Sequence, residues 1–156
     1  MKIEPLRIDE YDQLIQLWER CRLPCDRASR DSRVRIEQQL FDDRIVILTL
    51  KTDQGDIIGS VIGTYDGRKG WINRLAVDPD YRGRRLAARL IESAEERLAE
   101  MGAVIIGALI EDENFPSMSA FRHCGFDGFD EFVYFRKSVK PRADSGSQSP
   151  KNQRDN

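Results

Sequence analysis

The stretch 71–110 limits the possible folds of this chain more than any other part of it. Its centre, 86–101, predicts an amphipathic helix, because apolar side chains recur there at helical spacing and Gly102 supplies a C-terminal stop. The apolar stripe of this helix consists of Leu86, Leu90, Ala94, Leu98 and Met101. A strand-like run, 71–77, precedes the helix, and the continuously apolar run 104–110 follows it and suits a strand covered on both faces. Together these segments predict a β-α-β unit with parallel strands.

Three consecutive strands are expected before the long helix. The runs 45–50, 57–65 and 71–77 are rich in branched and aromatic side chains. Their connections, 53–56 and 66–70, are short and contain glycine, which favours tight turns. The chain is therefore expected to fold as an α/β protein with a mixed sheet, an antiparallel meander followed by the β-α-β unit.

Shorter elements are expected on either side of this centre. They are a strand at 3–8, a helix that begins at Asp9 as N-cap and ends before Pro24, a charged loop at 22–30, a helix at 31–40, a helix at 114–124 closed by Gly125, and a strand at 132–139. Residues 1–139 would then form one domain. The remainder, 140–156, has too little apolar content to fold and is expected to be a disordered tail.

Composition and charge exclude several classes of protein. The 156 residues are 40% hydrophobic and 33% charged with a net charge of -2, which is typical of a globular domain and gives no support to nonspecific nucleic-acid binding. The longest apolar run is far below the roughly 20 residues of a membrane-spanning helix, and the N-terminus lacks an apolar secretion signal, so we expect a cytoplasmic protein. Cys21, Cys25 and Cys124 lack metal-site spacing, and we expect reduced thiols and no metal.

An arginine-rich segment joins the third strand of the meander to the long helix. Four arginines fall within eight residues: Arg82, Arg84, Arg85 and Arg89. The first N–H groups of a helix have no partner inside it, and the helix dipole adds positive partial charge, so a phosphate binds well there. Gly83 and Ala87 keep side chains small where the backbone approaches a ligand. The segment predicts a diphosphate site, and a solvated helix face is the alternative.

The run 75–87, the helix after it and the Asn114 helix together resemble the GNAT superfamily of N-acetyltransferases. The pyrophosphate loop of that family, R/Q-x-x-G-x-G/A, is similar to residues 82–87, except that Arg85 stands where glycine is usual. The resemblance implies a GNAT-like fold with a splayed central strand pair, acetyl-coenzyme A (acetyl-CoA) as cosubstrate, and an amine acceptor. It is compatible with a homodimer, because dimers are common in the family. The implied cofactor contacts are Leu75, Ala76 and Val77 along the pantetheine arm, Arg82, Gly83, Arg84, Arg85, Leu86, Ala87 and Ala88 around the pyrophosphate, and Asn114.

Two catalytic positions depart from the pattern of the family. Phe121 stands where many members have a proton-donating tyrosine, and Leu109 stands where similar ribosomal-protein acetyltransferases have a glutamate base. If the preceding strand extends that far, Glu111 shares a face with Leu109 and is our candidate base, with a solvated strand end as the alternative. Tyr134 is our candidate acid, with a core aromatic as the alternative. The resemblance implies that the main-chain N–H of Val77 stabilises the oxyanion.

Three functions follow from these observations. The leading one is an N-acetyltransferase that acts on a primary amine of a small molecule or protein, and the second is a catalytically weakened acyl-CoA-binding module of the same fold. The third is a nucleic-acid-binding domain that uses the arginine cluster. The resemblance implies that the acceptor enters near the loop 22–30 and the turn 66–70. Asn73 and Arg74 either face that channel or lie on the meander surface, and His123 is expected on the surface.

Overall fold

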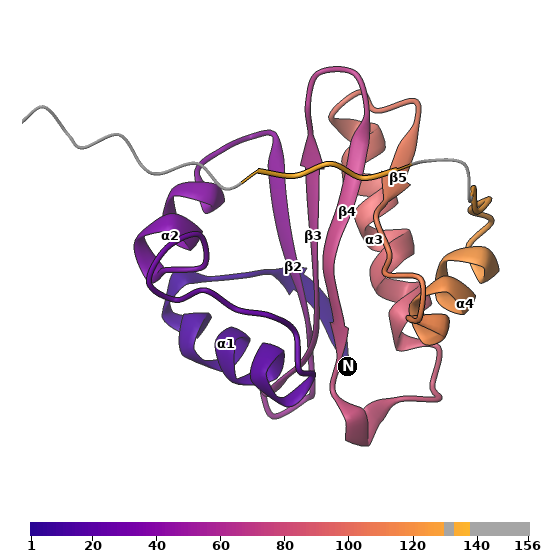
Figure 1. The fold of residues 1–156 in the computed structure, drawn as a ribbon. Coiled ribbons are helices and arrows are strands. Elements are labelled where there is room, and N and C mark those ends of the chain that lie inside the picture. Colours follow the sequence, from indigo (N-terminus) through magenta and orange to yellow (C-terminus); the bar gives the residue numbers. More distant parts are fainter. Residues whose placement is uncertain (130–132, 138–156) are drawn as a thin grey trace, which may run out of the picture.

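One five-stranded sheet separates two layers of helices in residues 1–129 and 133–137, which are the residues that the computed structural model describes (Figure 1). The strands lie in the order β1 (Lys2–Pro5), β2 (Ile45–Lys51), β3 (Ile57–Tyr65), β4 (Gly70–Val77) and β5 (Ile106–Ala108). The helices are α1 (Tyr11–Arg20), α2 (Arg33–Leu40), α3 (Leu86–Glu100) and α4 (Phe115–His123). Strands β1 to β4 pair antiparallel, and β5 pairs parallel to β4. The predicted mixed sheet, with its meander and β-α-β unit, is confirmed.

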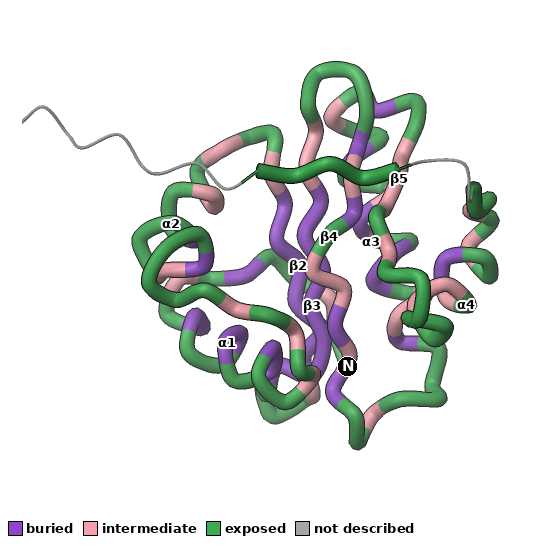
Figure 2. Tube along the Cα trace, viewed as in Figure 1, coloured by how far each residue is buried: buried purple, intermediate pink, exposed green. Residues whose placement is uncertain are grey.

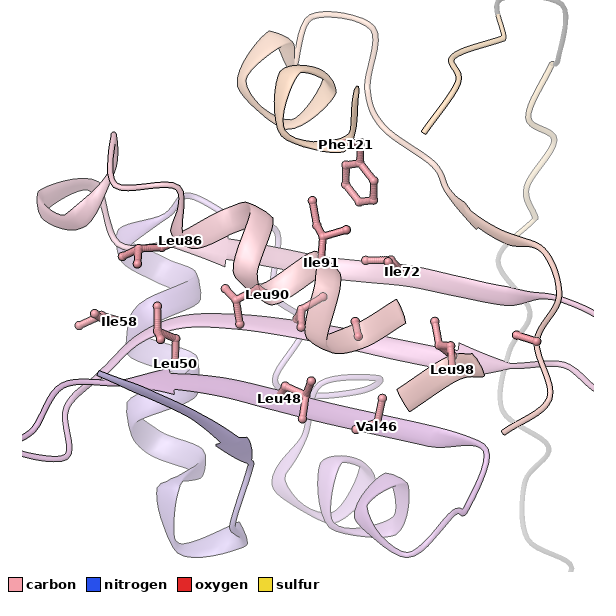
Figure 3. Packing of buried hydrophobic residues seen from close by; sticks show 13 residues of the cluster. Val46, Leu48, Leu50, Ile58, Ile72, Leu86, Leu90, Ile91, Leu98 and Phe121 are labelled. Atoms are coloured by element: carbon pink, nitrogen blue, oxygen red, sulfur yellow. The ribbon is translucent and has the colours of Figure 1, made fainter. Parts of the chain in front are cut away.

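The sheet separates two hydrophobic clusters because successive strand residues point to opposite faces. From β2, Val46, Leu48 and Leu50 pack under α3, whereas Ile47 packs under α1 and α2. Figure 3 shows the first cluster, in which Leu90, Ile91 and Leu98 of α3 lie over the strands and Phe121 of α4 joins them. Each fully buried aliphatic side chain stabilises the fold by about 1.5–3 kcal/mol. The predicted apolar stripe of the long helix therefore packs α3 against the sheet.

The junction of β1 and α1 differs from the sequence prediction. β1 ends at Pro5, and a short 3-10 turn, Ile8–Glu10, replaces the end of the expected strand. Glu10 rather than Asp9 is the N-cap of α1. The reason is local, since Asp9 lies within the 3-10 turn, and its carboxylate binds the Arg7 guanidinium.

The apolar run 104–110 forms a shorter and more exposed strand than expected. Only Ile106–Ala108 pairs with β4, and Val104 before this strand and Leu109 after it are 89% and 63% exposed. The expectation of a strand covered on both faces is wrong, because Ile106 and Ala108 pack on the cluster under α3 and no described residue of 104–110 belongs to the cluster on the other face. Beyond the pair Ile72 and Ala108 the two strands separate, and β4 continues to Val77 without a described partner on that edge. This opening agrees with the splayed pair that the family resemblance implies.

The C-terminal part of the chain bears on two further expectations. Residues 133–137 have no strand assignment and are exposed, so they do not form the predicted last strand, and Tyr134 has no strand face toward the core. The other residues of that prediction, 132, 138 and 139, lie outside the described residues, as does the whole segment 140–156 that we expect to be a tail. None of the helices in the described ranges has both the length and the apolar character needed to cross a bilayer.

Candidate functional site

A bulge in β4 positions one wall of the candidate site. Ser60 of β3 lies opposite Ala76 and Ile62 lies opposite Asn73, so two residues of β4 face a single residue of β3 between these pairs. The extra residue is Arg74, whose φ of 53° lies in the left-handed region. The bulge shifts the alternation of the strand, so that Leu75 and Val77 pack toward α3 and Ala76 packs toward α1.

A cavity of about 570 Å³ opens where β4 and β5 separate. This volume is in the range of about 300–1,000 Å³ that is usual for ligand sites. Its walls are the end of β4, the loop 82–85, the start of α3 and the α4 face. The predicted contacts that line it are Leu75, Ala76, Val77, Arg82, Gly83, Arg85, Leu86, Ala87, Ala88 and Asn114. The structure thus brings together all predicted cofactor residues except Arg84, and their contact with a cofactor stays a prediction.

The loop between β4 and α3 contains two left-handed residues. Gly83 has φ 77°, and a Cβ built on it would meet nothing within 4 Å, so the backbone angle rather than lack of space favours glycine there. Arg85 is the N-cap of α3 at φ 56° and ψ 21°, and its side chain makes no capping hydrogen bond. The N-cap side chain of α3 therefore leaves the first-turn N–H groups uncapped. The loop 82–85 beside them is exposed (Figure 2).

Arg84 is the predicted contact that the structure places away from the cavity. It lies between the two left-handed residues, and its guanidinium lies over the ring of Tyr81, 5.3 Å from the ring centre. Its neighbours Gly83 and Arg85 line the cavity, whereas Arg84 does not.

Polar contacts fix the end of β4 and the loop relative to each other. The carbonyl of Val77 accepts from Arg82 Nε at 3.1 Å and from Cys21 Sγ at 3.4 Å. The buried carboxylate of Asp78 accepts from Arg20 Nε at 2.7 Å and from the main-chain N–H of Asp80. Burial raises the pKa of the Cys21 thiol, an effect that the nearby Arg82 guanidinium opposes. The thiol is thus a neutral hydrogen-bond donor inside the cavity at neutral pH.

Helix α4 contributes cavity residues in addition to the predicted contact Asn114. Asn114 is its N-cap, and its side-chain carbonyl accepts from the main-chain N–H of Ser117 at 3.2 Å. Ser119 and His123 line the cavity further along the helix, and the α1 end adds Cys21 and Leu23. The four-residue spacing of Ser119 and His123 is the signal that marks one helical face. His123 is exposed, as expected, and also belongs to the cavity wall.

The two candidate catalytic residues lie outside the cavity wall. The strand ends at Ala108, so the extension that would place Glu111 on a face with Leu109 is absent, and Glu111 is an exposed loop residue. Tyr134 is 67% exposed and does not line the cavity either. Their catalytic roles stay predictions that the positions of these side chains do not favour.

Phe121 packs into the hydrophobic cluster under α3, a position that suits a side chain without a hydroxyl group. It is buried, and its ring meets that of Phe126 edge to face with centroids 5.0 Å apart. Figure 3 shows it pointing toward Ile91 of α3. Within the described part of the chain the cavity wall contains no carboxylate and no tyrosine, and its ionisable residues are Cys21, Arg82, Arg85 and His123. No group of side chains suited to a metal ion occurs among the described residues.

Comparison with known proteins agrees with this geometry. The model of the acetyltransferase (GNAT) family matches residues 11–126. An acetyltransferase of Sodalis glossinidius is 33% identical over 139 residues, which cover 89% of this chain and 96% of that protein. The chain therefore belongs to the GNAT acetyltransferase family, as its resemblance predicted.

Two solved structures show the same fold at lower identity. An aminoglycoside 6'-N-acetyltransferase of Acinetobacter haemolyticus has a TM-score of 0.73 and 20% identity, with 90% of this chain and 100% of that chain covered. The paiA N-acetyltransferase of Thermoplasma acidophilum, solved with coenzyme A, has a TM-score of 0.72 and 17% identity, with 83% and 91% covered. The predicted GNAT-like fold is confirmed.

Proposed function

We propose that this chain is an acetyl-CoA-dependent N-acetyltransferase that transfers the acetyl group to a primary amine of a small molecule or protein. The observation that carries the proposal is the cavity at the opening between β4 and β5, which combines a strand edge that no described strand pairs with and the start of α3. Family membership supports it, as do relatives that are acetyltransferases and a structural neighbour that binds coenzyme A.

The residues of the cavity suit the chemical groups of acetyl-CoA. The β4 edge at Leu75–Val77 offers main-chain groups to the pantetheine amides, as an added strand would. The α3 N-terminus offers N–H groups to the pyrophosphate, and Arg82 and Arg85 add positive charge. The small residues Gly83 and Ala87 leave room for a close approach. We therefore assign these residues to cofactor binding in this proposal.

The reaction that we propose is direct attack of the amine nitrogen on the thioester carbonyl carbon. A C–N bond forms, the C–S bond breaks, the amine loses one proton and the thiolate gains one. The main-chain N–H of Val77 is our candidate donor to the developing oxyanion. Glu111 is our candidate base and Tyr134 our candidate acid, and in this proposal both act through water because neither lines the cavity.

Thiol release tests the proposal directly. The protein is mixed with acetyl-CoA and a panel of amines that includes an aminoglycoside, glucosamine 6-phosphate and a lysine-containing peptide, and free thiol is measured against an amine-free blank. At least one amine is expected to raise the rate. Glu111→Gln is expected to lower kcat/KM by about 100-fold or more if Glu111 is the base, whereas Asp112→Asn, on the neighbouring exposed carboxylate, is the matched control.

A second candidate function is an acyl-CoA-binding module with weakened turnover. The lack of a carboxylate or tyrosine among the described residues of the cavity wall favours it. Calorimetric titration with acetyl-CoA separates the two functions. Tight binding without thiol release on any amine of the panel would support the module, and binding with release would support the enzyme.

We also propose a cytoplasmic location, a homodimer, and a domain boundary near residue 139. The three cysteines are free, which suits a reducing compartment. Light scattering during size-exclusion chromatography tests the dimer. Limited proteolysis tests the boundary, because a tail at 140–156 would be removed first.

A further inference from the structure

The guanidinium of Arg74 connects β4 to the loop between α1 and α2. Its Nη2 donates to both carboxylate oxygens of Asp31, at 2.7 and 2.6 Å, and its Nη1 donates to the carbonyl of Pro24. It also lies over the ring of Trp18, 4.6 Å from the ring centre. The side chains of Arg74 and Asp31 are only 16% and 7% exposed. Arg74 is therefore neither a free cation in an acceptor channel nor a surface residue, the two alternatives that the sequence left open.

Asp31 folds the same loop on itself. Its carboxylate accepts from the main-chain N–H of Asp26 at 2.8 Å, and its main-chain N–H donates to the carbonyl of Asp26 at 2.9 Å. The hydroxyl of Tyr11 donates to the carbonyl of Asp31 at 2.8 Å. Arg74 thus bonds the loop at both Pro24 and Asp31, and Tyr11 adds a second contact at Asp31. Leu23, next to the first of these points, lines the cavity.

Arg74 is also the residue on which the strand bulges. Ser60 Oγ donates to the main-chain carbonyl of Arg74 at 3.3 Å and accepts from Trp18 Nε1 at 2.9 Å. The residue that follows the bulge is Leu75, the first β4 residue of the cavity wall. The backbone of Arg74 therefore helps to set the edge that faces the cavity, and its side chain sets the loop beside it.

We infer that Arg74 is a positioning residue for the amine acceptor. It holds the loop 22–31 at one place relative to the β4 edge, and it does so without lining the cavity itself. A largely buried, charge-assisted pair in which one nitrogen of Arg74 bonds both Asp31 oxygens holds the two groups close together, and a displacement of about 1 Å between reacting groups can lower a rate by about 100-fold. The inference rests on the proposed function, because it requires that the acceptor meets the thioester beside this loop.

Three variants test the role of the ion pair. Arg74→Lys keeps the charge and loses the fork that binds Asp31 and Pro24 together, and Asp31→Asn keeps the shape and loses the charge. A single change leaves a buried charge unpaired, which can unfold the protein. The double variant Arg74→Met with Asp31→Leu removes both charges, so the loss of the ion pair is measured without that penalty. Arg44→Lys is the matched control, since Arg44 pairs with Asp42 at an exposed position.

Limited trypsin digestion reports the order of the loop without any acceptor. Exposed cleavage sites lie in the loop, at Arg27 and Arg30, and in the turn between β3 and β4, at Arg68 and Lys69. The ratio of loop cleavage to turn cleavage is expected to rise about tenfold in the Arg74 and Asp31 variants and to stay unchanged in Arg44→Lys. An unchanged ratio in the double variant, or equal acceleration at both sites, would overturn the inference, because the ion pair would then not act on the loop.

Kinetics distinguish positioning of the acceptor from general damage. The Kd for acetyl-CoA is expected to stay within about threefold, while kcat/KM for the best amine of the panel falls by at least about tenfold at saturating acetyl-CoA. An equal loss of acetyl-CoA affinity would show that Arg74 serves the cofactor and would refute the inference. If the unaltered protein releases no thiol with any amine, the proposed function fails, and the acceptor role of Arg74 fails with it. The cleavage ratio would still report separately whether Arg74 orders the loop.

Discussion

Replacing Arg85 with glycine is expected to stabilise the protein and to weaken acetyl-CoA binding at the same time. Arg85 begins α3 in the left-handed region, which strains an L-residue by about 1–2 kcal/mol. Glycine removes this strain but has about 0.5–1 kcal/mol more conformational entropy to lose on folding. The free energy of unfolding should therefore rise by about 0.5–1 kcal/mol, which corresponds to about 1–4 °C in Tm for a domain of this size.

Alanine at the same position separates the two effects. Arg85→Ala keeps the backbone strain and, like glycine, removes the guanidinium of a residue that lines the cavity. A hydrogen bond from a charged group contributes about 1.5–3 kcal/mol, so both variants should bind acetyl-CoA about 10- to 150-fold more weakly. They should share the loss of affinity and differ in stability.

The assays are urea unfolding without ligand and calorimetric titration with acetyl-CoA. Arg84→Ala is the control, because Arg84 lies over Tyr81 and outside the cavity wall, and its affinity should stay close to that of the unaltered protein. If the glycine variant is less stable than the alanine variant, the left-handed conformation at Arg85 is wrong. If both variants bind acetyl-CoA normally, the side chain does not reach the phosphates.

Three further predictions concern the core, the cavity thiol and α4. Gly59→Ala would place a Cβ 2.9 Å from Leu90 Cδ1 and should lower the free energy of unfolding by about 1–3 kcal/mol; an unchanged urea midpoint would contradict this packing. Because burial raises the pKa of Cys21, iodoacetamide should alkylate this thiol rapidly only at a higher pH than it needs for a free thiol. Acetyl-CoA should slow the alkylation, because Cys21 lines the cavity. Mass spectrometry measures both effects, and alkylation insensitive to acetyl-CoA would place the ligand elsewhere. Asn114→Ala should lower the free energy of unfolding by about 1 kcal/mol, because the Ser117 N–H loses its cap, and should also bind acetyl-CoA more weakly. Asn114→Ser should keep the cap and lose only affinity for acetyl-CoA. Equal stability of the two variants in urea would refute the capping role.

The sequence predicted the parts of the fold that depend on local patterns. The stripe of α3 and the alternating strands of the meander recur over many residues, so each element is specified by its own periodicity. Most of the β4 and α3 side of the cavity wall followed from the family pattern of residues 75–88, because that pattern is contiguous in the sequence.

The errors arose where exposure or pairing depends on distant residues. An apolar run such as 104–110 does not indicate how many of its faces other elements will cover, and β5 is half-buried with exposed residues on both sides of it. The pair of Arg74 and Asp31 joins residues far apart in the chain, and no spacing rule connects them. Asp9 failed as a cap because it lies within the 3-10 turn, where a neighbouring arginine binds its carboxylate.

The part of the β4 edge that pairs with no strand among the described residues has a thermodynamic consequence. A ligand that pairs with this edge binds only the folded chain, so it shifts the unfolding equilibrium by RT ln(1 + [L]/Kd), about 2.7 kcal/mol at a ligand concentration of 100 Kd. A gain of that size would move the melting temperature by about 5–11 °C. Melting curves recorded with a series of acyl-CoA thioesters would therefore rank the acyl groups that the protein accepts before any amine is known.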